Sequence, residues 1–428
     1  MIQRPRMLSF VVLCLVLTLW GAVNAAQSSL RVQLILGASA IKYLNDNVIP
    51  EFEREFNTGV DIETVNWNNR MEKLLITTAA GVPPDVYMSG AEHVLELVEN
   101  GLIAPLDREF SQWADRRDFL APTFGSSIWE GVHYGVPIYT APRVWWYRAD
   151  LFEDAGMSGD QPPRSWSELL DAAKRLTKTD GQQVIRQGYD LSRWTGTASP
   201  FGKLQDFAVY LWQIGGELFD DEYQPLFTSP ESIATMEFLF QLKEAVKPPG
   251  YQVVVPGGGG EALIKGAAVI NLAGGWISSQ VHQYAPDLLD VVKAIVPVPG
   301  EKNRVTNIFS DWLGIHAQST NKELAWEFIK AVTQPEVLVD MNAELGLLSP
   351  RRSTITEFAR RRPLSKYMYE TVEYARPYPV FPLSVQLSEA WSSQYTLAIE
   401  GQLGIVPAME EASRRWRVIL QEWSGAQQ

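Results

Sequence analysis

In this 428-residue chain, two tryptophans directly follow residues that could help them bind a ligand. Trp276 follows Gly274 and Gly275, so the backbone can turn tightly just before the indole. Asp311 directly precedes Trp312. An indole face stacks on apolar C–H groups, whereas a carboxylate accepts hydrogen bonds from hydroxyls. Such pairs suit a polyhydroxylated ligand, and the alternative for each tryptophan is packing within its own lobe.

The first hundred residues alternate between strand and helix patterns. Apolar residues alternate at 30–36 and recur at helical spacing over 41–56, where Pro50 suggests a break, and the two patterns repeat over 60–62, 71–75, 85–88 and 94–98. This order predicts a mostly parallel sheet with helices on both faces, and such sheets bind ligands at the carboxyl ends of their strands. Ser39, Trp67 and Glu92 are therefore expected near a cleft.

The rest of the chain continues the α/β pattern. Strands are expected at 143–147, 291–297 and 312–316, and helices after the capping box at 165–168, within 205–245, over 324–332, from Pro335 to Gly346, and twice in the last 45 residues. A chain of this length is too long for one core and suggests two domains.

The first 25 residues have the pattern of a secretory signal peptide. Arg4 and Arg6 precede an apolar run over 7–20, and Val23 and Ala25 fit the small-residue cleavage pattern. We expect cleavage after Ala25, with an uncleaved anchor as the alternative. The only cysteine lies within this apolar run, so the exported chain would form no disulfide.

Composition and spacing argue against several other classes of protein. A net charge of −13 is unlike that of nucleic-acid-binding proteins. The four histidines, at 93, 133, 282 and 316, have no metal-site spacing, and neither a phosphate loop nor a Gly-x-Ser-x-Gly turn occurs. We therefore expect no cofactor, no metal and no catalysis.

Several ordered segments carry a family resemblance. They are FEREFNTGV at 52–60, AAGVPPDV at 79–86, ENGLIAPLD at 99–107, YGVP at 134–137, WYRADLF at 146–152, PRSW at 163–166, KGAAVI at 265–270, GGW at 274–276 and NKELAWEFI at 321–329. Together they resemble bacterial ABC-transporter extracellular solute-binding proteins, in the sugar-binding family that includes maltose-binding protein. The resemblance runs from about residue 30 to 423.

The resemblance implies an α/β fold of two lobes, each a mostly parallel sheet flanked by helices, joined by crossing hinge segments. Residues 26–140 and 309–348 would form the N-terminal lobe, and residues 141–308 and 349–428 the C-terminal lobe. It also implies a monomeric periplasmic protein that holds a small carbohydrate between its lobes. Its partners would be the transmembrane permease subunits of an ABC importer.

The resemblance also adds ligand-binding candidates. It places Trp276, Trp391 and Glu92 where relatives hold sugars, and Trp312, Asp311, Tyr139 and Arg351 near the lobe crossings. With Trp67, Gly274, Gly275 and Ser39 these make up the expected site. Each could instead have a structural role. Thr140, Ala141 and Ser89 replace residues of the maltose pocket, so no particular sugar is implied.

Three alternatives to the capture of a neutral sugar for an importer remain open from the sequence. A sugar phosphate or glycerol phosphodiester would need a cationic pocket, for which Arg143, Arg193 or Arg351 could supply charge. A secreted glycoside hydrolase would need two suitably spaced carboxylates, and no local motif proposes a pair. A binding protein of this kind could also serve a chemosensor.

Overall fold

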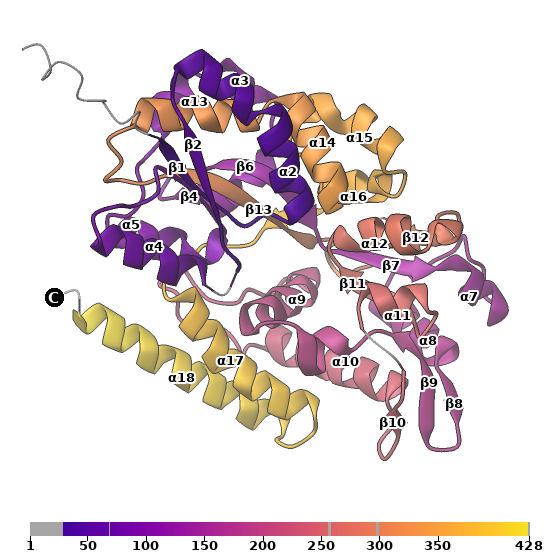
Figure 1. Ribbon diagram of the computed structural model, residues 1–428. Coiled ribbons are helices and arrows are strands. Elements are labelled where there is room, and N and C mark those ends of the chain that lie inside the picture. The colour runs from indigo at the N-terminus through magenta and orange to yellow at the C-terminus, as the bar shows by residue number, and fades with distance from the viewer. Residues whose placement is uncertain (1–28, 68, 256–257, 297–298, 427–428) are drawn as a thin grey trace, which may run out of the picture.

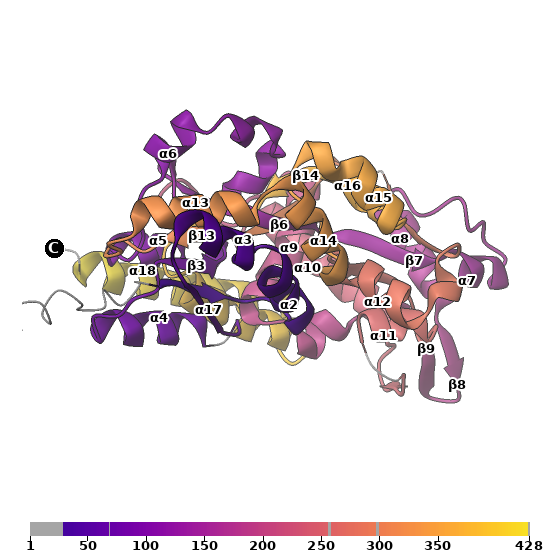
Figure 2. The same cartoon turned by 45° about the horizontal axis from the view of Figure 1, so that its top comes forward.

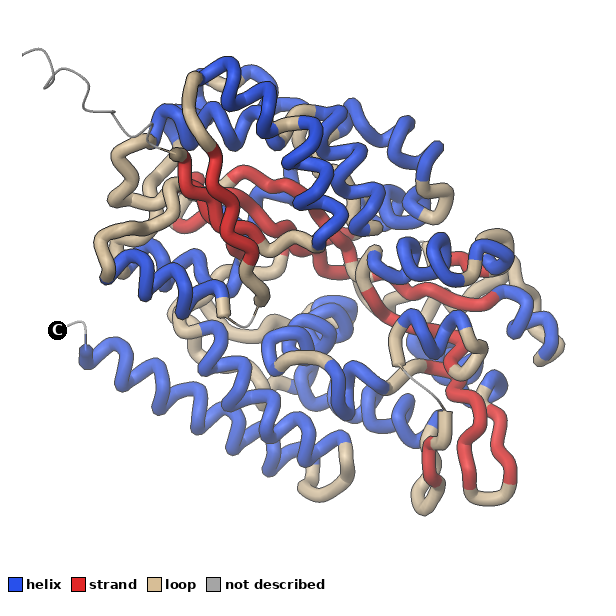
Figure 3. The backbone as a smooth tube through the Cα atoms, in the orientation of Figure 1, coloured by secondary structure: helices blue, strands red, loops and turns tan. Residues whose placement is uncertain are grey.

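The computed structural model describes residues 29–67, 69–255, 258–296 and 299–426. The expected signal peptide, residues 1–25, lies outside these ranges. The described chain forms two lobes, each built around its own sheet (Figures 1 and 3). The expected two-lobed α/β fold is confirmed. No described helix is both long enough and apolar enough to span a membrane.

The first lobe is built on a six-stranded sheet. Its order is β14-β13-β3-β1-β2, and β6 pairs with β13. The strands are β1 (Leu30–Leu34), β2 (Val60–Thr64), β3 (Val86–Ser89), β6 (Val136–Pro142), β13 (Thr306–Ile315) and β14 (Ala375–Pro377). β1 runs parallel to β2 and β3, whereas β13 runs antiparallel to β3 and β6.

Helices cover both faces of this sheet. One buried cluster joins α2 (Ala38–Asn47), α3 (Ile49–Phe56), α13 (Lys322–Val332) and α14 (Pro335–Leu345) to the strands. A second cluster on the other face includes Leu74 of α4 (Arg70–Ala79) and Val94 of α5 (Val94–Glu99). Pro50 stands in the first turn of α3, where its missing N–H is not needed, so the expected break before it is confirmed.

The second lobe is built on another six-stranded sheet, of order β10-β9-β11-β7-β12 with β8 beside β9. The strands are β7 (Val144–Arg148), β8 (Lys178–Asp180), β9 (Gln183–Tyr189), β10 (Gln252–Val253), β11 (Ala268–Ala273) and β12 (Val292–Ala294). β9 runs parallel to β10 and β11, and β7 runs antiparallel to β11 and β12. The sheet is thus mixed rather than mostly parallel as expected, because the chain enters it along β7 from the other lobe and β8 pairs antiparallel with β9.

Ten further α-helices among the described residues lie in or beside the second lobe. They are α7 (Ala149–Asp154), α8 (Trp166–Leu176), α9 (Pro200–Gln213), α10 (Pro230–Val246), α11 (Gly260–Ile264), α12 (Trp276–Tyr284), α15 (Ile355–Arg361), α16 (Ser365–Val372), α17 (Ser384–Ile399) and α18 (Ile405–Ala426). The long pair α17 and α18 lies side by side below α9 and α10 in Figure 1. Figure 2 shows α6 (Asp107–Gln112) standing out from the first lobe on another side.

Two long strands join the lobes. β6 and β13 pair along most of their length, and the chain passes from β6 through Arg143 directly into β7 (Figure 1). The backbone of Arg143 is fixed at this crossing, because its N–H donates to the carbonyl of Asn307 at 2.9 Å and its carbonyl accepts from the Thr306 hydroxyl at 2.8 Å. Residues on this part of the two strands therefore lie where both lobes meet.

Candidate functional site

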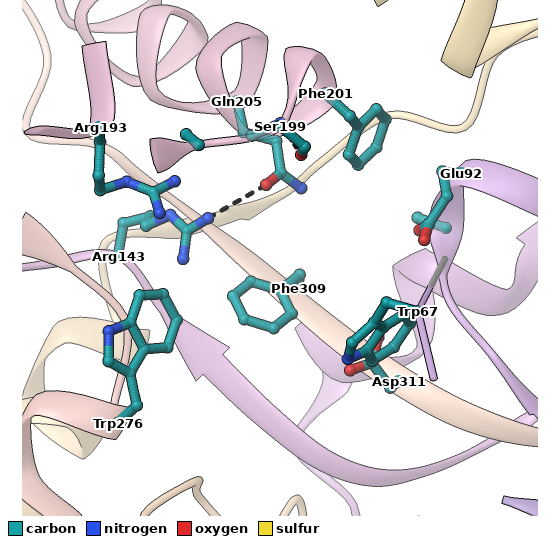
Figure 4. A pocket seen from close by; sticks show the side chains of 13 residues that line it. Trp67, Glu92, Arg143, Arg193, Ser199, Phe201, Gln205, Trp276, Phe309 and Asp311 are labelled. Atoms are coloured by element: carbon teal, nitrogen blue, oxygen red, sulfur yellow. Dashed lines mark hydrogen bonds between the residues drawn. The ribbon is translucent and has the colours of Figure 1, made fainter. Parts of the chain in front are cut away.

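A cavity of about 270 Å³ lies between the lobes, beside the β6–β13 crossing. Figure 4 shows its side chains converging from both lobes. Its lining residues are Trp67, Ala91, Glu92, Arg143, Arg193, Ala198, Ser199, Phe201, Gly202, Gln205, Trp276, Phe309 and Asp311. Aromatic rings and charged groups share this small space, which is the composition expected of a polar-ligand pocket.

The first-lobe wall contains three of the expected site residues, Trp67, Glu92 and Asp311. Trp67 precedes α4 and is 40% exposed, and the guanidinium of Arg70 lies 4.6 Å from its ring centre. Arg70 also forms an ion pair with Glu92 in the short helical turn at Ala91–His93. Arg70 therefore holds both the indole and the carboxylate at the edge of the cavity.

Asp311 is a buried carboxyl on β13, on the same wall as Glu92. Burial raises the pKa of Asp311 to about 8, although a hydrogen bond from Tyr139 opposes the rise. Of two nearby charges, the Glu92 carboxylate raises this pKa further and Arg70 lowers it. Asp311 is therefore mostly protonated at neutral pH and can donate a hydrogen bond as well as accept one.

Trp276 and two arginines form the second-lobe wall. Trp276 opens α12, and the guanidinium carbons of Arg143 and Arg193 lie 5.2 and 5.9 Å from its ring centre. The Arg143 guanidinium also lies 5.1 Å from the ring centre of Phe309. The rings and cations attract one another in this geometry, so they hold one another in place.

The carboxylate of Asp206, on α9, accepts hydrogen bonds from both arginines. Its Oδ1 accepts from Nε of Arg143 at 3.1 Å, and its Oδ2 accepts from Nε of Arg193 at 2.6 Å. Nη2 of Arg143 donates to Oε1 of Gln205 at 3.2 Å, the dashed contact in Figure 4. Burial, together with the nearby Arg193 cation, lowers the pKa of Arg143 to about 10, against the opposing effect of Asp206.

Among the larger cavity side chains, sequence reasoning left out Phe201, Gln205 and Phe309, and it named Arg143 and Arg193 only as charges for a phosphate-binding alternative. Phe309 had a usable signal, because it lies two positions before Asp311 on one strand and so faces the same side. Arg143 was detectable as the residue between two strands at a crossing. No local sequence pattern marked Arg193 or Gln205 as a cavity residue. Arg193 lies in a π-helical turn, Arg193–Thr197, that the sequence did not predict.

Trp312 does not line the cavity, contrary to its expected role. Successive residues of a strand point to opposite faces, so Trp312 faces away from the side that Asp311 occupies. Its indole is fully buried and donates to the carbonyl of Ser126 at 2.8 Å. Tyr139 pairs with Asp311 across β6 and β13 but is itself buried and outside the lining, so it acts on the cavity through its hydrogen bond to Asp311.

Trp391 and Arg351 are also structural rather than cavity residues. Trp391 is fully buried within the second lobe and stacks on Tyr395 with ring centres 4.6 Å apart. Arg351 is 2% exposed, and its Nη1 lies 3.2 Å from an oxygen of Asp115. Both sequence assignments are corrected, because neither side chain reaches the cavity.

The remaining expected residues are small. A Cβ on Gly274 would lie 2.1 Å from Cζ3 of Trp276, so this glycine lets the indole fold back over the backbone. A Cβ on Gly275 would meet the Gly346 carbonyl oxygen at 2.6 Å, so it serves packing. Ser39 is exposed in the first turn of α2 and lies outside the cavity lining.

Within the described ranges, no cluster of three or more His, Cys, Asp or Glu could hold a metal.

Known proteins resemble this chain in sequence. Residues 37–338 match the family described as bacterial extracellular solute-binding protein. A putative binding protein of Brucella abortus is 26% identical over 310 residues, which cover 71% of each chain. The maltotriose-binding protein of Pyrococcus abyssi is 23% identical, over 70% of this chain and 60% of that protein.

Solved structures share the fold. An ABC transporter solute-binding protein from Thermotoga lettingae, bound with α-D-tagatose, superposes with a TM-score of 0.76 at 23% identity, covering 92% of this chain and all (100%) of the other. The sugar-binding protein MalE from Xanthomonas citri gives a TM-score of 0.77 at 20% identity, covering 93% and 99%. With the family match extending over more than half of its length, this chain belongs to the bacterial extracellular solute-binding proteins.

Proposed function

We propose that this protein captures a carbohydrate in the cavity between its lobes and delivers it to the transmembrane permease of an ABC importer. One observation carries the proposal: aromatic rings and hydroxyl-binding polar groups line a single cavity at the lobe crossing. Trp67, Trp276 and Phe309 offer ring surface for the C–H groups of a sugar. Glu92, Asp311 and Gln205 offer donors and acceptors for its hydroxyls.

Relatives with named ligands support the carbohydrate class. They include a maltotriose-binding protein, a mannitol-binding protein of Pseudomonas aeruginosa and an α-glucoside-binding periplasmic protein of Rhizobium meliloti. The volume of the cavity, about 270 Å³, is just below the range of typical small-molecule sites, which is about 300–1,000 Å³. We therefore propose a ligand of one or two rings rather than a long oligosaccharide.

Transport would use closure of the two lobes, with the ligand favouring the closed state. We propose that residues 1–25 export the chain to the periplasm, where it works as a monomer. The proposed lobes comprise residues 26–140 and 309–348, and residues 141–308 and 349–428, except that β14 within the last range pairs with β13 in the first-lobe sheet. The hinge in this scheme is the crossing at β6 and β13.

We further propose that the protein binds its ligand without catalysis. Glu92 and Asp311 lie on one wall, but the Glu92 carboxylate is held by Arg70 and the Asp311 carboxyl by Tyr139. A glycosidase instead holds its two carboxyl groups on either side of the scissile bond.

Thermal unfolding of the purified protein against mono- and disaccharides, polyols, sugar acids and sugar phosphates tests the proposal. A binding ligand should raise the unfolding temperature increasingly with its concentration. Chromatography of the recovered ligand should show it unaltered. Stabilisation only by amino acids or metals would overturn the carbohydrate assignment, and a cleaved ligand would overturn the absence of catalysis.

A further inference from the structure

The second-lobe wall of the cavity has more cationic donors than its own structure uses. Arg143 and Arg193 both contact the single carboxylate of Asp206. Nη1 of Arg143 is buried and has no hydrogen-bond partner among the described residues, and the residue as a whole is only 4% exposed. A buried guanidinium N–H without an acceptor is costly, so an acceptor brought by a ligand would be favoured there.

Arg193 stands beside the start of a long helix that faces the same space. Ser199, Phe201 and Gly202, at the N-terminus of the 14-residue α9, line the cavity. Nη2 of Arg193 lies 3.4 Å from the position that a Cβ on Gly202 would take. The Ser199 hydroxyl already accepts from the Gly202 N–H at 3.1 Å, so α9 contributes chiefly the positive end of its dipole.

Nearby carboxylates do not cancel this arrangement. Asp190 also lies near Arg193, but its oxygens accept from the N–H groups of Ser192, Gly259 and Asn271, and it does not line the cavity. On the opposite wall, Glu92 is paired with Arg70. Asp311 is mostly neutral at pH 7, because its pKa is raised to about 8. The positive groups therefore face a wall that carries little opposing charge.

The two guanidiniums are also held in position before any ligand arrives. Trp276 and Phe309 pack against Arg143, and Asp206 bonds to the Nε of each arginine. Fixed guanidinium forks match the paired oxygens of carboxylate and phosphate groups better than they match single hydroxyls.

From this geometry we propose that Arg143, Arg193 and the N-terminus of α9 form a subsite for an anionic group of the ligand. The ligand class would then be acidic saccharides, with either a carboxylate, as in uronic acids, or a phosphate ester. The inference rests on the proposed sugar-binding function. It assigns the acidic group to the second lobe and leaves the sugar ring between Trp276 and Trp67.

Isothermal titration with matched ligand pairs tests this subsite. The pairs are galactose and galacturonate, glucose and glucuronate, and glucose and glucose 6-phosphate. At least one acidic member should bind about tenfold or more tightly than its neutral partner, and added salt should reduce the difference. The uronate and phosphate pairs distinguish the two sources of the anionic group.

Arg193→Gln should reduce the ratio of acidic to neutral affinity toward one. Arg414→Gln, which removes an exposed arginine from α18, should keep the wild-type ratio. If Arg193→Gln does not fold, as judged by circular dichroism, Arg143→Lys provides a second test. It keeps the positive charge and loses the fork, so it should also lower the ratio.

Two outcomes separate this inference from the proposed function. Neutral sugars that bind as tightly as their acidic partners would overturn the anionic subsite and leave sugar binding in place. Binding of no saccharide, neutral or acidic, would overturn both.

Discussion

The guanidinium carbon of Arg143 lies 5.2 Å from the centre of the Trp276 indole ring. Arg143 comes from the crossing between the lobes, whereas Trp276 opens a helix of the second lobe. The contact therefore joins the aromatic surface of the cavity to the crossing between the lobes, and both residues line the same cavity (Figure 4).

Trp276→Ala should weaken ligand binding by about tenfold or more, because one buried ring surface contributes roughly 1.4 kcal/mol or more. Titration calorimetry with the ligand found by thermal unfolding measures the loss. Trp423→Ala, on the distant helix α18, is the matched control and should bind normally. Unchanged affinity in Trp276→Ala would remove this indole from the site.

The two glycines before Trp276 should respond differently to alanine. Gly274→Ala places a methyl group 2.1 Å from Cζ3 of the indole, so the ring must move and ligand affinity should fall. Gly275→Ala meets the Gly346 carbonyl oxygen at 2.6 Å, so it should instead lower the free energy of unfolding by about 1–3 kcal/mol. Urea unfolding and calorimetry together separate these effects, and the opposite pattern would contradict this assignment.

Asp311→Asn should change how stability depends on pH. Between about pH 4 and pH 8 the unfolded chain has ionised Asp311, whereas the folded chain keeps it protonated, because its pKa is raised to about 8. The folded state binds the extra proton, so this residue makes the wild type progressively less stable as pH rises through that range. The loss levels off above the folded pKa.

The asparagine variant has no carboxyl at this position to titrate. Its free energy of unfolding should therefore rise relative to that of the wild type by up to a few kcal/mol from pH 4 to pH 8. Urea unfolding at several pH values measures the difference. Parallel pH profiles for the two proteins would show that Asp311 is ionised in the folded state.

Arg351→Ala should destabilise the fold and leave ligand affinity unchanged. Its guanidinium contacts Asp115 and Asp118 and lies 4.8 Å from the ring centre of Phe119. We expect a loss of about 1–3 kcal/mol, because the two carboxylates are partly exposed and can return to water. A loss of ligand affinity in a folded variant would restore Arg351 to the binding site.

Local sequence patterns were enough to predict the two-lobed α/β fold. The stripe over 41–56, the break at Pro50 and the stop at Gly346 reappear as α2, α3 and the end of α14. The site was harder, because it depends on which face of an element a residue occupies. Trp312 and Trp391 had the right residue type but point into cores, whereas Arg193 reaches the cavity from a turn with no recognisable pattern.

Arg143 stands on the segment about which the lobes would rotate, and its side chain reaches into the cavity. A rotation of the lobes about this segment would change the direction of a charged group in the cavity. One residue would then both lie at the rotation axis and contact the ligand. Selectivity and opening angle cannot then be engineered separately. A biosensor made from this chain should change its signal amplitude whenever its specificity is altered at this position.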